Sequence, residues 1–217
     1  MVIAIDGPSG AGKGTVARTI ARELQFRHVD TGAMYRAVAW LALQRGIALS
    51  EAAALADIAA TAEFELSTRI AVDGHDVTMA IRTPEMDAAA AAVARLPELR
   101  KALVDRQRRM ATEGPLVMEG RDIGTVVFPD ARVKIFLDAS AEERARRRAL
   151  DPAHAAKGGE VGQIQQQLEA RDQSDRTRAA SPLTKAEDAV YIDTTGLSIE
   201  AVVSQVLDVV RERMTPA

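Results

Sequence analysis

The sequence predicts an α/β fold in which a central parallel β-sheet is flanked by helices. Short apolar segments alternate along the chain with longer segments of helical periodicity, and this order of elements is typical of a parallel sheet. The apolar segments carry few charged residues, as strands covered on both faces require. The 217 residues suffice for a substantial core, and we expect one domain over residues 1–217.

The first expected strand, residues 2–6, leads into a glycine-rich stretch. Glycines let successive backbone N–H groups point into one concavity, the N-terminus of the next helix adds partial positive charge, and Lys13 adds a full charge. The helical spacing of Val16, Ile20 and Leu24 places that helix directly after the stretch. This order predicts a phosphate-binding loop, and the alternative is a tight turn with a chance lysine. The loop consists of Gly7, Pro8, Ser9, Gly10, Ala11, Gly12, Lys13, Gly14 and Thr15.

Further strands of the parallel sheet are expected downstream, each as a mostly apolar run. They span residues 27–30, 115–119, 133–138 and 189–193. A helix follows the fourth of the five strands, where Ser140 and Glu143 have the spacing of a capping box. The last helix begins near Ser198. Its buried stripe consists of Val202, Val206 and either Val209 or Val210.

Residues 63–81 break this rhythm with alternating apolar and polar positions, which predict a small antiparallel sheet inserted into the parallel fold. Its expected strands are residues 64–66, 70–72 and 77–79, with a turn at Asp73 and Gly74. Two helices are expected to follow, over residues 84–95 and 97–113. The insert then occupies about residues 60–95.

A second irregular region lies between arginine-rich helices. Residues 151–162 contain Pro152 and three glycines, a composition that predicts a mobile flap. We expect this flap to form part of a helical lid over about residues 148–178.

Composition excludes several classes of function. The 28 basic and 31 acidic residues give a formal net charge of −3, so no polybasic face indicates a nucleic-acid polymer or a membrane as partner. The absence of cysteine excludes disulfides and thiolate chemistry. His28, His75 and His154 lack the spacing of metal ligands. The apolar run 88–94 is too short to span a bilayer, and no signal peptide is evident. We expect a cytoplasmic protein and a monomer.

Two groups of polar residues stand where expected strands end. The first group consists of Asp30, Tyr35 and Arg36, and the second of Arg121 and Asp122. Ligands of open α/β sheets bind at the C-terminal ends of the strands, so both groups lie at the edge where a ligand is expected. The alternatives are a helix cap at Asp30 or Thr31 and a surface ion pair between Arg121 and Asp122.

A third group is rich in arginine. Arg171, Asp175 and Arg178 are spaced four and three residues apart, so they share one face of a helix and can act together. Arginine suits phosphate recognition because its planar guanidinium pairs with two oxygens at once. Residues 144–148 contain four more arginines, for which a solvated helix face is the alternative.

Taken together, these residues resemble the bacterial cytidylate kinases. The likeness runs nearly end to end, and its most specific parts are the glycine loop with its Lys-Gly-Thr ending and the run Gly-Arg-Asp-Ile-Gly-Thr-Val-Val-Phe-Pro-Asp-Ala at residues 120–131. Further matching stretches are residues 30–36, 81–83, 134–140 and 171–183, together with Pro97, Arg100, Gln107 and Arg108.

The resemblance implies a P-loop kinase fold and a direct in-line transfer of phosphate from ATP to CMP or dCMP, with Mg²⁺ on the donor phosphates. It implies that residues 7–15 bind ATP. The residues expected to be catalytic are Lys13, Arg121, Arg171 and Arg178. The residues expected around the acceptor are Ser9, Asp30, Tyr35, Arg36, Arg100, Arg121, Asp122, Arg171, Asp175 and Arg178.

The chemistry of cytosine agrees with this implied acceptor site. A carboxylate such as Asp122 can accept from the N4 amino group, and a guanidinium such as Arg100 can donate to N3 and O2. Uracil reverses the donor and acceptor at positions 3 and 4, so these charged groups would be mispaired with it.

The chain departs from the usual patterns at two places. Gly14 separates Lys13 from the first hydroxyl, so Thr15 is only a candidate ligand for Mg²⁺ and we expect no metal site made by the protein alone. Residues 88–92 are all alanine where members of the resembled family often carry a hydroxyl that helps to bind the base. The preference among CMP, dCMP and UMP therefore stays open.

Two rival functions remain. Another small-molecule kinase, for adenylate, shikimate or gluconate, is compatible with the glycine loop, but Arg100, Asp122 and the antiparallel insert argue against it. A nucleotide-driven switch of the GTPase class reads guanine with an Asn-Lys-x-Asp motif, and this chain contains no asparagine.

Overall fold

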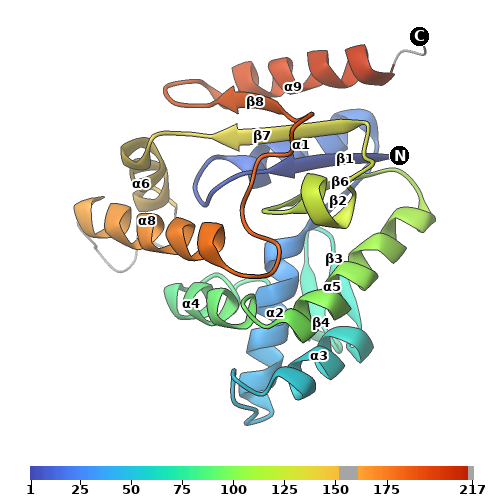
Figure 1. The fold of residues 1–217 in the computed structure, drawn as a ribbon, viewed down its shortest axis with the longest axis vertical. Coiled ribbons are helices and arrows are strands. Elements are labelled where there is room, and N and C mark those ends of the chain that lie inside the picture. The colour runs from blue at the N-terminus through green and yellow to red at the C-terminus, as the bar shows by residue number, and fades with distance from the viewer. Residues whose placement is uncertain (152–160, 215–217) are drawn as a thin grey trace.

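Five parallel strands form the central sheet of the computed structural model, which describes residues 1–151 and 161–214 (Figure 1). The strands are β1 (Val2–Asp6), β2 (Arg27–Asp30), β6 (Leu116–Gly120), β7 (Val133–Asp138) and β8 (Val190–Asp193). They lie in the order β2-β6-β1-β7-β8, and adjacent strands are parallel. The predicted fold class is confirmed, and the strand limits agree with the prediction to within one residue.

The register of the strands brings their C-terminal ends to one edge of the sheet. Asp6, the last residue of β1, lies opposite Gly120 of β6 and Phe136 of β7. Asp30, the last residue of β2, lies opposite Glu119. The loops that follow β1, β2 and β6 therefore start side by side, which is what allows distant motifs to meet.

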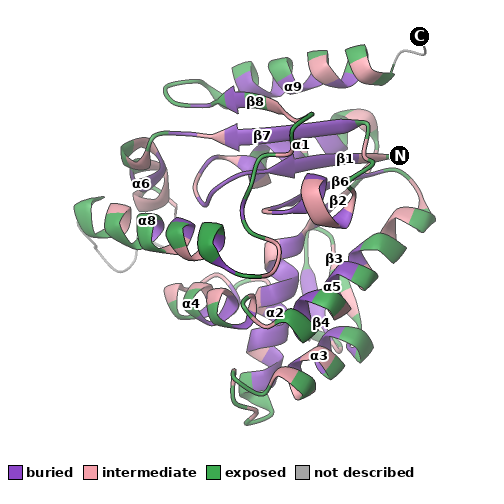
Figure 2. Ribbon diagram, viewed as in Figure 1, coloured by how far each residue is buried: buried purple, intermediate pink, exposed green. Residues whose placement is uncertain are grey.

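Helices cover both faces of the sheet (Figures 1 and 2). The helices of the described residues are α1 (Lys13–Leu24), α2 (Thr31–Gln44), α3 (Ala52–Thr61), α4 (Pro84–Val93), α5 (Pro97–Met110), α6 (Ala141–Ala149), α8 (Val161–Thr177) and α9 (Ile199–Met214), with short turns η1 (Ala111–Glu113) and η2 (Ile123–Val127). Helix α3 packs on α2 and α5, and α4 packs on α2, rather than on the sheet. On one face, Ile5 shares a buried cluster with Val16 of α1 and Val206 of α9. On the other, Ala4 shares a cluster with Met34 of α2. Successive residues of β1 thus serve opposite faces.

The last helix buries the predicted stripe. Val202, Val206 and Val210 are buried, whereas Val209 is only partly buried. Of the two candidates for the third buried position, Val209 and Val210, the structure therefore has Val210. These valines recur at a spacing of four residues, which keeps them on the face of α9 that packs against α1 and β7.

The predicted capping box of α6 is half wrong. The Ser140 hydroxyl does cap the helix by accepting from the Glu143 N–H at 3.2 Å. The Glu143 carboxylate instead binds Arg146 and Arg147, and the Ser140 N–H donates to the Thr195 hydroxyl. Two neighbouring guanidiniums are stronger partners for a carboxylate than one backbone N–H.

The insert is a three-stranded antiparallel sheet of β3 (Phe64–Leu66), β4 (Ile70–Val72) and β5 (His75–Asp76). Asp73 and Gly74 form the predicted turn with φ of 47° and 76°. The third strand was predicted at residues 77–79 and is wrong in position. The Val77 N–H still donates to the Ile70 carbonyl oxygen, but the Thr78 hydroxyl accepts from the Ile70 N–H and Asp76 accepts from the Thr78 N–H, so side chains replace part of the ladder beyond β5.

The predicted flap falls largely outside the described residues. Residues 152–160 are not described, and residues 161–162 belong to the start of α8. Helices α6 and α8 pack against each other at the edge of the sheet where β7 ends (Figure 1). Over residues 1–151 and 161–214, every helix is too short or too polar to cross a bilayer.

Candidate active site

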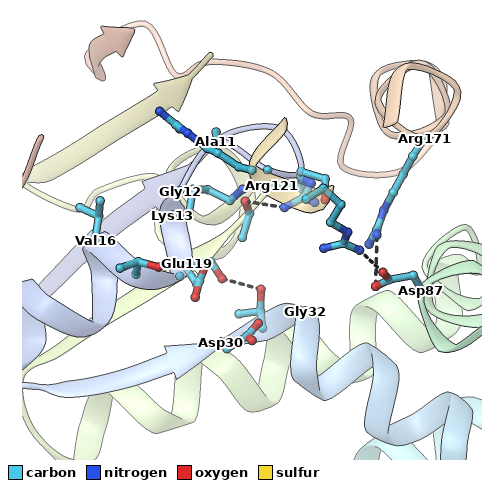
Figure 3. A pocket seen from close by; sticks show the side chains of 18 of the residues that line it. Ala11, Gly12, Lys13, Val16, Asp30, Gly32, Asp87, Glu119, Arg121 and Arg171 are labelled. Carbon is cyan, nitrogen blue, oxygen red and sulfur yellow. Dashed lines mark hydrogen bonds and ion pairs between the residues drawn. The ribbon is translucent and has the colours of Figure 1, made fainter. Parts of the chain in front are cut away.

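A cavity of about 660 Å³ lies at the C-terminal edge of the sheet (Figure 3). Its walls come from the glycine loop, the first turns of α2, the end of β6, and helices α4, α5, α6 and α8. Every predicted site residue lines it except Gly7 and Pro8. Gly7 lies beneath the loop, where a Cβ would stand 1.9 Å from the carbonyl oxygen of Leu137. Residues separated by more than 160 positions in the sequence thus share one cavity.

Lys13 is the buried cation of the glycine loop. Its side chain follows directly after Gly12, whose φ of 90° ends the loop at the start of α1, and Nζ donates to the carbonyl oxygen of Pro8 at 2.6 Å. Burial, together with the positive charge of Arg121, lowers the pKa of Lys13 to about 7. An anion placed in the loop would reverse this shift because it favours the charged amine.

Two oxygen-bearing side chains stand beside the first turn of α1. Thr15 is exposed and lines the cavity. Glu119 approaches Gly14 so closely that a Cβ on Gly14 would lie 3.1 Å from Oε1, which gives a packing reason for glycine after Lys13. Hydroxyl and carboxylate oxygens are ligands that suit Mg²⁺. In the part of the chain that the structure describes, no three His, Cys, Asp or Glu side chains gather as a ready metal site.

Arg144 ties the loop to the helices beside it. It is 6% exposed, donates to the carbonyl oxygen of Ser9 at 3.0 Å, and contacts Asp172 of α8 at 2.5 Å. A Cβ on Gly10 would lie only 2.9 Å from Cβ of Arg144, so the close packing requires glycine there. The sequence left open that the arginines of residues 144–148 form a solvent-exposed helix face. That alternative is right for Arg146, which is exposed, and wrong for Arg144, which is buried.

Asp30 is both a helix cap and a member of the cavity wall. Oδ1 accepts from the Ala33 N–H at 2.9 Å, and Oδ2 accepts from Arg36 at 3.1 Å. Burial alone would raise the pKa of Asp30, but Arg36 and the Ala33 N–H hold it below its usual range. The cap is therefore not an alternative to a ligand role, because the same carboxylate also holds Arg36 at the cavity.

Arg100 and Asp122 form a buried pair in the deeper wall. Their closest atoms, Nη2 and Oδ2, are 2.5 Å apart, and the side chains are 4% and 9% exposed. The Arg100 guanidinium also lies 5.4 Å from the centre of the Tyr35 ring. Burial raises the pKa of Tyr35 to about 12, so its hydroxyl is neutral. The surface ion pair that was the alternative for Arg121 and Asp122 is wrong, since each pairs with a different residue inside the cavity.

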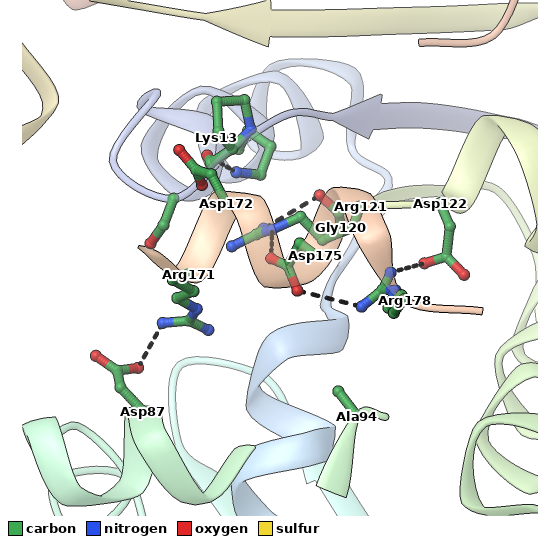
Figure 4. Close-up of polar contacts among 12 residues, drawn as sticks. Lys13, Asp87, Ala94, Gly120, Arg121, Asp122, Arg171, Asp172, Asp175 and Arg178 are labelled. Atoms are coloured by element: carbon green, nitrogen blue, oxygen red, sulfur yellow. Dashed lines mark hydrogen bonds and ion pairs between the residues drawn. The ribbon is translucent and has the colours of Figure 1, made fainter. Parts of the chain in front are cut away.

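Asp175 joins two of the predicted arginines (Figure 4). It accepts from Arg121 Nε at 3.0 Å and from Arg178 Nη1 at 3.3 Å. Burial would raise the pKa of Asp175, but these arginines lower it. Arg178 lies one residue beyond the end of α8 and also approaches Asp122 at 4.0 Å, so it links the two ion pairs.

Asp87 of α4 is a charged residue whose position the sequence analysis missed. Its carboxylate lies 3.3 Å from Arg171 of α8 and 3.7 Å from Arg36 of α2, and it accepts a hydrogen bond from Arg148 of α6 (Figures 3 and 4). Only its place beside the alanine run could have drawn attention to it.

Several buried guanidinium N–H groups have no hydrogen-bond partner among the described residues. They belong to Arg36 Nε, Arg100 Nε, Arg171 Nε and Arg178 Nη2. Unpaired buried donors are costly, and those of Arg36, Arg171 and Arg178 come from α2, from α8 and from the residue that follows α8, all of which line one cavity. This combination suits a ligand that carries several acceptor oxygens.

Further residues line the cavity on the side of α9 and were not predicted. Leu197, Ile199 and Val202 supply apolar surface there. Arg147 crosses to this side and donates to the carbonyl oxygen of Thr194 at 2.6 Å. Scattered apolar residues at the start of a helix carry no local motif, so the sequence offered no signal for them.

Solved structures with a similar fold include a gluconokinase from Sinorhizobium meliloti 1021 and a shikimate kinase from Acinetobacter baumannii. The first covers 97% of this chain and 91% of its own at a TM-score of 0.51 and 14% identity. The second covers 99% and 95% at a TM-score of 0.50 and 17% identity. At these identities the likeness shows the fold alone.

The sequence relatives show the family as well as the fold. Cytidylate kinase from Desulfitobacterium hafniense (strain Y51) is 50% identical over 216 residues, 98% of this chain and 93% of the relative. Cytidylate kinase from Pelotomaculum thermopropionicum is 50% identical over 213 residues, 94% of this chain and 93% of the relative. A family model described as cytidylate kinase matches residues 3–212. The chain belongs to the cytidylate kinase family.

Proposed function

We propose that the protein phosphorylates CMP and dCMP with ATP, giving CDP or dCDP and ADP. The observation that carries the proposal is the set of buried arginine donors without hydrogen-bond partners, in a cavity that also holds the glycine loop. Family membership supplies the reaction class, and the paired charges of Arg100 and Asp122 supply the reason for cytosine.

On the donor side, the backbone N–H groups of residues 9–15 and the amine of Lys13 would hold the phosphates of ATP, aided by the N-terminus of α1. Mg²⁺ would be held by oxygens of Thr15 and Glu119 together with the donor phosphates, and when bound it neutralises charge on those phosphates. The apolar surface of Leu197 and Ile199 offers a place for the adenine ring.

On the acceptor side, Arg36, Arg121, Arg171 and Arg178 would clamp the phosphate of CMP. Arg100 and Asp122 would read the base, with Asp122 accepting from N4 and Arg100 donating to N3 or O2. Ser9, Asp30, Tyr35 and Asp175 would complete this side, two of them by holding arginines in place.

The chemistry needs no covalent intermediate on the enzyme. A phosphate oxygen of CMP attacks the γ-phosphorus of ATP, the bond from that phosphorus to the β–γ bridging oxygen breaks, and ADP leaves with the electron pair. The arginines would bring the two anions together and neutralise charge that spreads over the transferring group. The lid, residues 148–178, would exclude water that could otherwise hydrolyse ATP.

The proposal is tested by offering ATP with a panel of nucleoside monophosphates, shikimate and gluconate in a coupled ADP-release assay. We expect CMP and dCMP to be phosphorylated fastest. Faster turnover of AMP, shikimate or gluconate would favour the rival small-molecule kinases, and nucleotide binding without transfer to any acceptor would favour a switch protein. Ala90 and Ala91 line the cavity and offer no hydroxyl to the base. The rate with UMP, compared with that for CMP, measures how well the enzyme distinguishes the two bases without one.

The proposed enzyme would act as a cytoplasmic monomer with one domain over residues 1–217, in which residues 60–95 form the monophosphate-binding insert. Light scattering after size exclusion tests the monomer directly. A mass near 23.3 kDa supports it, and twice that mass contradicts it.

ATP binding is expected to take up a proton at alkaline pH. Lys13 has a pKa of about 7 in the free protein, so it is mostly neutral at pH 8.5, and the triphosphate should raise that pKa because it favours the charged amine. The affinity for ATP should therefore fall as the pH rises above 7. Calorimetry at pH 8.5 in two buffers of different ionisation enthalpy should report nearly one proton taken up, and zero uptake would contradict the assignment.

A further inference from the structure

Asp6 places its carboxylate under the loop that carries Arg121 and Asp122. Oδ1 accepts from the backbone N–H of Ile123 at 2.8 Å, and Oδ2 accepts from that of Gly124 at 2.7 Å. The residue is 5% exposed. One carboxylate thus satisfies two consecutive backbone donors of a segment 117 and 118 residues away in the sequence.

Asp6 also connects two parts of the cavity. It is the last residue of β1 and directly precedes Gly7, the first residue of the glycine loop. Its partners directly follow Asp122 at the start of the turn η2. Both hydrogen bonds therefore fix the loop after β6 relative to the loop after β1.

The arrangement changes what Asp122 is able to do. An aspartate at the N-cap of a helical turn usually accepts from the backbone N–H groups of that turn. Asp122 occupies the N-cap of η2 and makes no such hydrogen bond. Asp6 accepts from the Gly124 N–H, which such a cap could bind, and from the Ile123 N–H beside it, while the Asp122 carboxylate pairs with Arg100 at 2.5 Å.

Lys134 confines the loop as well. A Cβ on Gly124 would lie 3.2 Å from Cδ of Lys134 and 3.4 Å from Oδ2 of Asp6. Lys134 is itself held, since Nζ donates to Asp188 at 2.8 Å and to the carbonyl oxygen of Pro129. The backbone at Gly124 therefore has little room to shift while Asp6 is in place.

The Asp6 carboxylate is kept at this place at a cost. Burial raises its pKa to about 6, although the N–H groups of Gly124 and Ile123 act in the opposite direction. A raised pKa means that the folded state binds a proton more readily than the unfolded chain between pH 3.8 and 6, so stability falls as pH rises through that window. At neutral pH the charge disfavours folding, which is the behaviour expected of a group retained for its position.

We propose that Asp6 is a positioning residue for base selection: by capping η2 in place of Asp122, it leaves the Asp122 carboxylate available to the cytosine of the acceptor. This inference rests on the proposed function, in which Asp122 and Arg100 read the base.

The test compares Asp6→Ala and Asp6→Asn with the wild type and with Asp138→Asn. Asp138 is the matched control, because it also ends a strand of the sheet, but among the described residues its carboxylate accepts only from its own neighbour, the Ala139 N–H. We expect Asp6→Ala to lower the ratio of kcat/KM for CMP over UMP about tenfold, mainly through a higher KM for CMP, because Asp122 turns back to cap η2. Asp138→Asn should leave that ratio unchanged.

A double-mutant cycle separates positioning from general damage. In the Asp122→Asn background, Asp6→Ala should cause no further loss of selectivity, since the carboxylate that it positions is gone. Should Asp6→Ala not fold, the isosteric Asp6→Asn takes its place in the cycle, because it keeps one acceptor and turns an N–H₂ group toward the other backbone donor. Thermal unfolding is recorded for each variant.

An unchanged CMP-over-UMP ratio in a folded Asp6 variant would overturn the inference, as would additive losses in the cycle. Failure of the proposed function would look different, because the wild type itself would then not phosphorylate CMP.

Discussion

In the Lys13→Ala variant, turnover of ATP with CMP falls by about 10²–10³-fold or more. Lys13 is the full positive charge within the glycine loop, and its Nζ is held at the loop by the carbonyl oxygen of Pro8. In the transition state this charge would face the β- and γ-phosphates, where the loop amides alone supply only partial charges. Steady-state assays with saturating ATP and CMP measure the loss in kcat.

The same variant should fold at least as well as the wild type at pH 7. Burial lowers the pKa of Lys13 to about 7 from 10.5, so the unfolded chain binds more protons between these values and stability rises with pH over that window. Removing the lysine removes this rise, which chemical denaturation at pH 7 and pH 9 can measure. Lys101→Ala, at an exposed lysine of α5, is the control. Near-normal turnover in folded Lys13→Ala would refute the role given to Lys13.

The second large effect is expected from Asp122→Asn. Its carboxylate would accept from the cytosine amino group and is the partner of Arg100, so kcat/KM for CMP should fall about 100-fold. The new amide presents N–H₂ as well as oxygen, which matches the acceptor at position 4 of uracil, so UMP should lose much less. The measured quantity is the ratio of kcat/KM for CMP over UMP.

Asp105→Asn is the matched control for that experiment, because it removes one negative charge from an exposed position of α5. We expect it to leave the ratio unchanged. If Asp122→Asn slowed CMP and UMP equally, Asp122 would be acting on the phosphate or the fold and the assignment to the base would be wrong.

Local patterns predicted most of the fold. Four of the five strands of the parallel sheet are short, mostly apolar runs, whereas β2 has a single apolar residue, Val29. The Asp73-Gly74 turn was found because few residues adopt positive φ as readily. The errors arose where side chains compete for hydrogen bonds. The Thr78 hydroxyl accepts a hydrogen bond that a strand partner would otherwise accept, and the Glu143 carboxylate binds guanidiniums instead of the backbone N–H of a capping box. Such choices depend on neighbours that sequence spacing does not reveal.

The site was predicted in part for the same reason. The glycine loop and the run at residues 120–131 are contiguous, so their residues could be named in advance. The contacts of Asp6, Asp87 and Arg144 each join elements far apart in the sequence, and no local pattern marks them. Asp87 in particular is a carboxylate at the edge of an alanine run, and only the fold places three arginines around it.

The central claim is that one cavity brings a triphosphate and a cytosine nucleotide together for direct phosphoryl transfer. Its most direct test follows the isotope of γ-labelled ATP in a single turnover with CMP. We expect the label in the β-phosphate of CDP, with none bound to protein and little in inorganic phosphate. Label that appears only in inorganic phosphate, with CMP unchanged, would contradict the account.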